Sequence, residues 1–310
     1  MTEITASLIK ELRDKTGAGM MDCKKTLTEA NGDMDAAVDL LRKKGLATAA
    51  KKSGRAAAQG LVSVSAEGNY GVVIELNAET DFVSRNDQFQ KFLTDITELA
   101  LKNKIDSIEA LKAADLGGKT VEETLTNLIA TIGENMNLRR LQTLSVKEGI
   151  IASYVHNTIV SGCGKIGVLV ALESSGKQDV LVATGKQLAM HVAAVRAEAL
   201  DVNSLCPDLV ARERALHADK AKESGKPAEI VEKMIEGSMR KYYEKVVLNE
   251  QTLFDDGKTK ITSVLQDAGK EAGAPVKISG YIRYELGEGV EVDSNGDDFA
   301  DEVAKMAAGG

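Results

Sequence analysis

The feature that most constrains the fold is a repeated pattern of two strands and a helix in the middle of the chain. Residues 61–64 and 70–76 are rich in β-branched side chains and are separated by a Gly-Asn turn, which predicts a β-hairpin. The segment 68–74 aligns with 164–170, and a helical pattern follows each copy. Two copies are too few for a solenoid. The repeat therefore predicts an α+β fold, with a core of two related subdomains that each contain a small antiparallel sheet and packed helices.

The N-terminal residues are expected to form a three-helix module similar to a ubiquitin-associated domain. Three apolar patterns with helical spacing, the first of which includes Leu12, are separated by glycine-containing breaks. The third helix should end at Gly45, and the Ala- and Lys-rich stretch 46–59 should form a helical linker. Met20 and Met21 follow the first inter-helix loop. Two interpretations are open: these methionines pack in the core of the module, or they make adaptable apolar contacts with another surface.

A second helical feature interrupts the second subdomain. Two helical patterns, 207–223 and 227–245, predict an antiparallel helical hairpin inserted at about 201–243. The apolar run 246–248 then predicts a return to strand. The chain thus divides into four expected parts: 1–54, the N-terminal module and linker; 55–146, core subdomain 1; 147–284, core subdomain 2 with the hairpin; and 285–310, an acidic C-terminal module with a helix over 298–306.

Composition and charge narrow the functional classes. The chain has a formal net charge of −8, which disfavours a protein that binds nucleic acid directly. It contains no run of about eighteen apolar residues and no leader with a basic start, so we expect neither a membrane span nor secretion. Its cysteines, Cys23, Cys163 and Cys206, are odd in number and widely spaced, which favours a reducing environment. We therefore expect a cytoplasmic protein.

Motifs for catalysis and metal binding fail on inspection. Residues 117–120 resemble the end of a phosphate-binding loop, but Ala113 stands where the first glycine is required. The segment 293–298 resembles a calcium loop but lacks the turn glycine. A nucleophile pair of Cys163 and His156 stays open, although no oxyanion-type loop accompanies it. We expect no catalytic residue, no metal site and no cofactor, and a protein that is not an enzyme.

The segment 77–85 lies where the second strand of the first hairpin gives way to a helical pattern over 87–101. At such a corner a rigid scaffold can hold side chains toward a partner. Phe82 stands here between Asp81 and Arg85. Two interpretations are open: Phe82 covers the core while Asp81 caps the helix, or both side chains face a binding partner.

Several motifs, taken together and in order, resemble the bacterial elongation factor Ts family. Leu12-Arg13 with residues 16–25, TGAGMMDCKK, looks like the family's opening signature, and residues 80–83, TDFV, resemble its second signature. Further matches occur in family order at 132–135, 154–156, 190–194 and 283–289. The likeness extends from about residue 2 to 309. One departure is the turn 157–165, which is longer than the family's usual turn.

This resemblance implies a guanine-nucleotide exchange factor that binds elongation factor Tu, both with GDP and nucleotide-free. It would dislodge Mg²⁺ and promote GDP release, so that GTP can be reloaded during translation elongation. The residues implied in displacing the partner's Mg²⁺ are Thr80, Asp81, Phe82 and Val83. The residues implied in partner binding are Leu12, Met20, Met21, Ile132, Gly133 and His156.

Two further expectations concern partners. The helical hairpin at about 201–226 resembles a protrusion that serves dimerisation in some family members, which suggests a homodimer through this hairpin. Neither nucleic acid nor a membrane is an expected partner. The alternative function is an adaptor or scaffold that binds a protein partner without nucleotide exchange.

Overall fold

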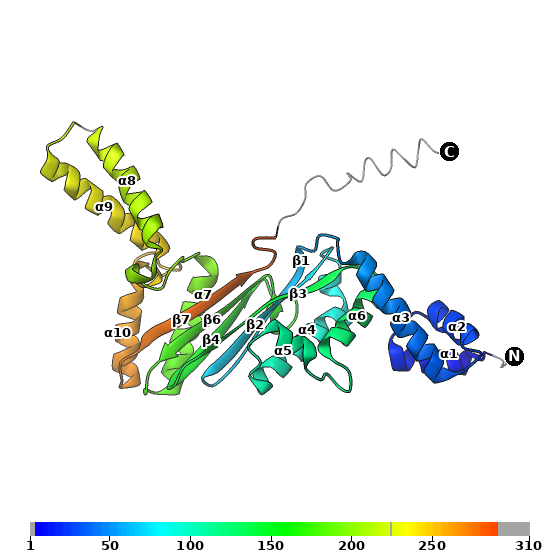
Figure 1. Cartoon of the computed structure of the whole chain (residues 1–310). Helices are drawn as coiled ribbons and strands as arrows, with labels where there is room; N and C mark the ends of the chain where they lie inside the picture. Colours follow the sequence, from blue (N-terminus) through cyan, green and yellow to red (C-terminus); the bar gives the residue numbers. More distant parts are fainter. Residues whose placement is uncertain (1–3, 224, 291–310) are drawn as a thin grey trace.

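The computed structural model describes residues 4–223 and 225–290. Three parts follow one another along the molecule in Figure 1: the helical N-terminal module, two β-sheets with their covering helices, and a projecting helical hairpin. The expected C-terminal helix over 298–306 and the calcium-like segment 293–298 lie outside the described residues. Within the described part of the chain, no helix is both long and apolar enough to cross a membrane.

The N-terminal module has the three expected helices, α1 (Ala6–Thr16), α2 (Met20–Glu29) and α3 (Met34–Lys52). Thr5 and Asp33 cap α1 and α3 through their side chains, and Gly17 ends α1 in the left-handed conformation. The expected end of the third helix at Gly45 is wrong, because α3 continues to Lys52. Gly45 lies within this helix, buried against Ala130, where a Cβ would make an ordinary van der Waals contact at 3.6 Å.

The first sheet and its helices confirm the predicted hairpin and capping box. Its strand order is β3-β2-β1-β5, and the first three strands are antiparallel neighbours. Thr120 and Glu123 form the predicted capping box of α6. The elements are β1 (Gln59–Glu67), β2 (Tyr70–Ala78), α4 (Asp87–Asn103), α5 (Ile108–Ala113), α6 (Val121–Ile132), β3 (Met136–Ser145) and β5 (Cys163–Gly164).

The second sheet has the order β4-β6-β7 and is also antiparallel. It is covered by α7 and α10, whose apolar side chains share a core with the sheet. The predicted helix near 261–265 extends further than expected. The elements are β4 (Gly149–His156), β6 (Ile166–Glu173), α7 (Gln178–Ala194), α10 (Ile261–Ala272) and β7 (Lys277–Glu285).

The two sheets pack face to face, so that the core has helices on both outer sides. A third apolar cluster joins strands of both sheets, including Val64 and Leu169. The aligned glycines of the repeat lie at this contact. A Cβ on Gly71 would lie 2.7 Å from Ile151 Cγ2, and one on Gly167 would lie 2.5 Å from Val64 Cγ2. Glycine therefore occurs at equivalent places in both copies because the sheets approach closely there.

The helical hairpin is confirmed, but the strand expected after it is wrong. The hairpin consists of α8 (Pro207–Lys222) and α9 (Ala228–Val246), which project from the second sheet's end of the molecule (Figure 1). Val246 is the last residue of α9, and Leu248 begins the short helix η3 (Leu248–Glu250) after the single parallel bridge of Val247 to Ala199. The apolar run is buried where the hairpin joins the core, so its hydrophobicity reflects burial rather than strand pairing.

A charged cluster attaches the end of β7 to the first sheet. Glu75 is fully buried on β2, and its carboxylate accepts hydrogen bonds from Arg139 and Arg140 and from the backbone N–H of Gly287 at 2.8 Å. The Arg140 guanidinium lies 3.9 Å from the ring centroid of Tyr284. A buried charge is tolerated when it is fully paired in this way.

Candidate functional site

The corner between β2 and α4 holds a phenylalanine in solvent. Phe82 is 77% exposed and Asp81 is also exposed, whereas Val83 is only 3% exposed. The interpretation in which Phe82 covers the core is therefore wrong. Helix α4 is capped by Asn86, whose side chain accepts hydrogen bonds from the N–H groups of the first turn, so the capping role considered for Asp81 is wrong as well.

Buried neighbours fix the corner on the C-terminal side of Phe82. Val83 packs in the first core and begins the short helix η1 (Val83–Arg85). Ser84 is buried too, and its hydroxyl donates to the Asp81 carbonyl at 2.5 Å. The Gln90 side chain donates to the Ser84 carbonyl at 2.8 Å. Because the two residues that follow Phe82 are buried, the backbone at Phe82 is held in place on this side.

A carboxylate fixes the corner on the N-terminal side. Both oxygens of Glu134 accept from Thr80, at 2.9 Å from its backbone N–H and 2.8 Å from its hydroxyl. This contact brings the Phe82 corner next to Ile132 and Gly133, which end α6. Gly133 adopts φ 85° as the helix C-cap, and its carbonyl accepts from the Lys52 ammonium group at the end of α3. Ile132 is half-buried against the first core.

The N-terminal module presents two of its three expected site residues. Met20 and Met21 are 57% and 65% exposed, so the interpretation that places them in the core is wrong. Leu12 is 0% exposed and packs in the centre of the module with Cys23 and Leu27. Direct contact between Leu12 and a partner is therefore contradicted. Its side chain stabilises the module that carries the two methionines.

His156 is exposed at the end of β4. Its Nδ1 is 3.3 Å from the Tyr154 hydroxyl. Cys163 is fully buried, and burial raises the pKa of its thiol, which disfavours the thiolate a nucleophile needs. The Cys163–His156 pair is therefore contradicted. The long turn 157–165 instead supplies β5, in which Cys163 pairs with Ser63 of the first sheet.

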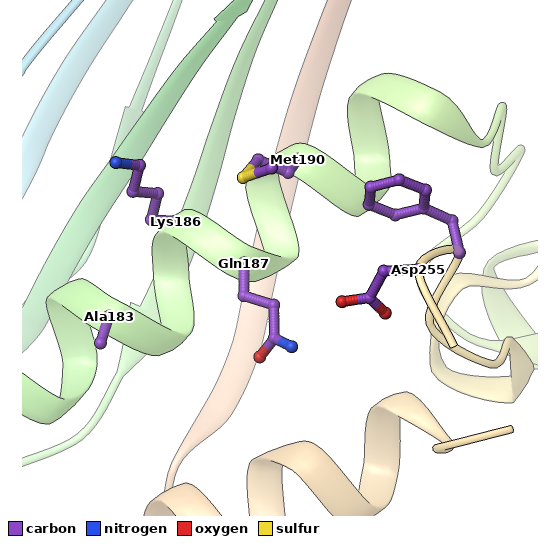
Figure 2. Close-up of a pocket in the computed structure, with 6 residues that line it drawn as sticks. Ala183, Lys186, Gln187, Met190 and Asp255 are labelled. Atoms are coloured by element: carbon purple, nitrogen blue, oxygen red, sulfur yellow. The ribbon is translucent and has the colours of Figure 1, made fainter. Parts of the chain in front are cut away.

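A shallow pocket of about 270 Å³ lies on the outer side of α7 (Figure 2). It is lined by Ala183, Lys186, Gln187, Met190, Phe254 and Asp255. Beneath it, buried His191 accepts from the Phe254 N–H at Nδ1, 3.2 Å away, while its Nε2 lies 2.9 Å from Gln251 Oε1. Burial lowers the pKa of His191, which keeps the imidazole neutral in this arrangement. Its role is to fix the pocket wall.

Glu134 and Asn135 lie in the matched motif 132–135 and Glu79 lies in the segment 77–85, but the sequence assigned none of them a supporting role at the corner. Glu79 accepts from the backbone N–H of Asn135 and pairs with Arg55 at 3.3 Å, and the Asn135 amide donates to the Arg55 carbonyl at 2.7 Å. The available signal was Glu134-Asn135 directly after a helix-ending glycine. Sequence alone does not show that this pair meets the strand-to-helix corner.

These features favour a protein that binds another macromolecule. Phe82, Met20 and Met21 are exposed apolar groups on well-supported elements, and large exposed apolar groups of this kind are typical of interaction surfaces. Among residues 4–223 and 225–290 no group of three or more His, Cys, Asp or Glu side chains could hold a metal ion.

Comparison with known proteins gives the family. The family model for elongation factor TS matches residues 79–288. Curated proteins named elongation factor Ts are similar over nearly the full chain: that of Rhodospirillum centenum is 59% identical over 309 residues, with 99% of this chain and 100% of the relative covered, and that of Paramagnetospirillum magneticum is 57% identical with 99% and 98% covered. The chain belongs to the elongation factor Ts family and is thus a translation elongation factor.

Proposed function

We propose that the protein is a guanine-nucleotide exchange factor that binds elongation factor Tu with GDP, dislodges Mg²⁺ and promotes GDP release. The observation that carries this proposal is Phe82, 77% exposed on a corner that is fixed on both sides. Family membership supports the choice of partner. Released partner is then free to reload GTP during elongation.

This function needs no catalytic acid or base in the protein. An exchange factor must bind the nucleotide-free partner more tightly than the GDP-bound partner, and the coupling is reciprocal between the two ligands. The protein therefore acts on a GTPase partner without being an enzyme. Exposed side chains on rigid supports suffice for such differential binding.

In this proposal Phe82 is the side chain that inserts into the partner, and we call it the wedge. Burying one phenylalanine is worth about 1.5–3 kcal/mol, and about 1.4 kcal/mol corresponds to a tenfold change in rate. Phe82 thus supplies about ten- to a hundredfold of the acceleration. Two roles are open for Asp81, the exposed neighbour: its carboxylate competes for the partner's Mg²⁺, or it caps a displaced helix of the partner. Thr80 and Val83 act by holding the wedge, because one is hydrogen-bonded to Glu134 and the other is buried.

The remaining contacts are distributed over the molecule. In this proposal Met20 and Met21 dock the N-terminal module, Ile132 and Gly133 border the wedge, and His156 adds a contact from the second sheet. The partition proposed from the sequence, 1–54, 55–146, 147–284 and 285–310, then assigns docking to the first part and the wedge to the second. A second copy of the chain, bound through α8 and α9, remains our proposal for self-association.

Stopped-flow release of a fluorescent GDP from elongation factor Tu tests this function. The protein should accelerate release strongly, and Phe82→Ala should lower the acceleration by about ten- to a hundredfold without loss of folding. Phe254→Ala removes another exposed phenylalanine outside the corner and is the matched control. Acceleration that does not depend on Phe82 would refute the wedge. Binding without acceleration would instead favour the adaptor.

A further inference from the structure

We propose that Glu134 and Glu79 are positioning residues that hold Phe82 outward before the partner arrives, an inference that rests on the proposed exchange function. Neither carboxylate is exposed at the wedge itself. Each acts through a hydrogen bond to a neighbouring turn.

The two acidic residues form reciprocal hydrogen bonds between two turns. Residues 79 and 80 follow β2, and residues 134 and 135 follow α6. The Glu134 carboxylate accepts from the backbone N–H of Thr80, and the Glu79 carboxylate accepts from the backbone N–H of Asn135. Two turns that are more than fifty residues apart are thus joined from both directions. Hydrogen bonds to ionised groups are stronger than those between neutral groups.

All four carboxylate oxygens have donors in this arrangement. The Glu134 oxygens accept from the Thr80 N–H and hydroxyl, and the Glu79 oxygens accept from the Asn135 N–H and the Arg55 guanidinium. The pair is therefore occupied as a structural connection and differs from an open acidic cluster that awaits a cation. Satisfied networks of this kind select one local conformation.

These hydrogen bonds restrict the backbone at Phe82, because Phe82 lies between two fixed residues. Thr80 is attached to Glu134 on one side, and Val83 is buried in the first core on the other. Only Asp81 and Phe82 are exposed between them. Ordering a segment in advance reduces the free energy that must be spent on ordering at the step in which Phe82 inserts and GDP is released, after the first contact with the partner. The wedge is thus pre-organised by contacts that a partner does not have to make.

The same cluster also connects the wedge to the N-terminal module. Arg55 lies in the segment between α3 and β1, its carbonyl accepts from the Asn135 side chain, and its guanidinium pairs with Glu79. The Arg55 side chain is largely exposed, so its ion pair contributes little by itself. The buried amide of Asn135 is the stronger link.

The test is the dependence of GDP release on protein concentration for Glu134→Ala and Glu134→Gln. Glu134→Ala should lower the maximal rate by about tenfold, since both hydrogen bonds to Thr80 are lost, with less than about a twofold change in the half-saturating concentration. Glu134→Gln should retain most of the rate, because its amide can accept from the Thr80 N–H and donate to the Thr80 hydroxyl. Glu122→Ala, at an exposed position of α6, is the control.

A double variant distinguishes the positioning of Phe82 by Glu134 from a general disturbance of the structure. In a Phe82→Ala background, Glu134→Ala should cause no further loss of the maximal rate, because its effect passes through Phe82. Thr80→Val, which removes only the hydroxyl donor, covers the case in which Glu134→Ala fails to fold. An unchanged maximal rate in a folded Glu134→Ala, or equal loss in the Ala and Gln variants, would overturn the positioning role. If the unmodified protein fails to accelerate release, the proposed function itself fails.

Discussion

The two copies of the strand–corner–helix unit use the same scaffold and differ at the corner. In the first copy, residues 79–86 join β2 to α4 and present Phe82. In the second copy, the shorter segment 174–177 joins β6 to α7 and is closed against α10, where the Lys177 N–H donates to the Ala272 carbonyl at 3.1 Å. The repeated sheet supports both corners, and only the longer one presents an exposed phenylalanine. In the proposed function, the binding contact therefore arises where the first copy departs from the repeat.

Substitution of the glycines at the sheet contact tests whether the two copies share one scaffold. These substitutions should have the largest effect on stability. Gly167→Ala would place a Cβ 2.5 Å from Val64 and 2.6 Å from Val62, and β-branched side chains have few alternative rotamers. We expect a loss of about 1–3 kcal/mol in the free energy of unfolding, measured with urea. Gly71→Ala should lose a similar amount if the two copies are equivalent.

Gly237→Ala is the control for these substitutions. This glycine lies within α9, and a Cβ there would meet nothing within 4 Å. Alanine should stabilise the helix by about 0.5–1 kcal/mol. A cost at Gly237 similar to that at Gly167 would show that the loss does not arise from sheet packing.

The closed corner gives the next prediction, which separates stability from exchange. Gly176→Ala would place a Cβ 2.6 Å from the Ala272 Cβ and 2.9 Å from its carbonyl oxygen. We expect a cost of about 1 kcal/mol, because the corner segment can shift more easily than a sheet. Ala272→Gly should recover part of the loss. The maximal rate of GDP release per folded molecule should be unchanged, in contrast to Phe82→Ala.

Local sequence signals predicted the elements, and longer-range contacts decided the site. The capping box at Thr120, the Gly-Asn turn and the helical hairpin depend on neighbouring residues, and all three are confirmed. The run 246–248 was misassigned because burial and strand pairing favour the same residue types. Leu12 belongs to a recognised motif, yet its burial depends on the three-helix packing. Likewise, the Glu134–Thr80 contact follows from the tertiary fold, which sequence spacing does not show.

The second subdomain contains a buried polar support that should respond to acid, and this gives the smallest predicted effect. In the second subdomain His191 is buried and neutral, with its pKa lowered by burial, and its Nδ1 accepts from the Phe254 N–H. Protonation would place a second donor against that N–H. Because the folded pKa lies below the unfolded value, the unfolded state binds more protons as pH falls through about 6.5. The contribution of neutral His191 to the free energy of unfolding should therefore be fully present above this pH and decrease below it.

Urea unfolding between pH 7.5 and 5.5 measures this decrease. His191→Gln should be less stable overall but should lose less stability over the same pH range, because the titrating group has been removed. His217→Gln, on the projecting helix α8, should keep the decrease seen in the unmodified protein. An equal pH dependence in His191→Gln would assign the acid sensitivity to other groups.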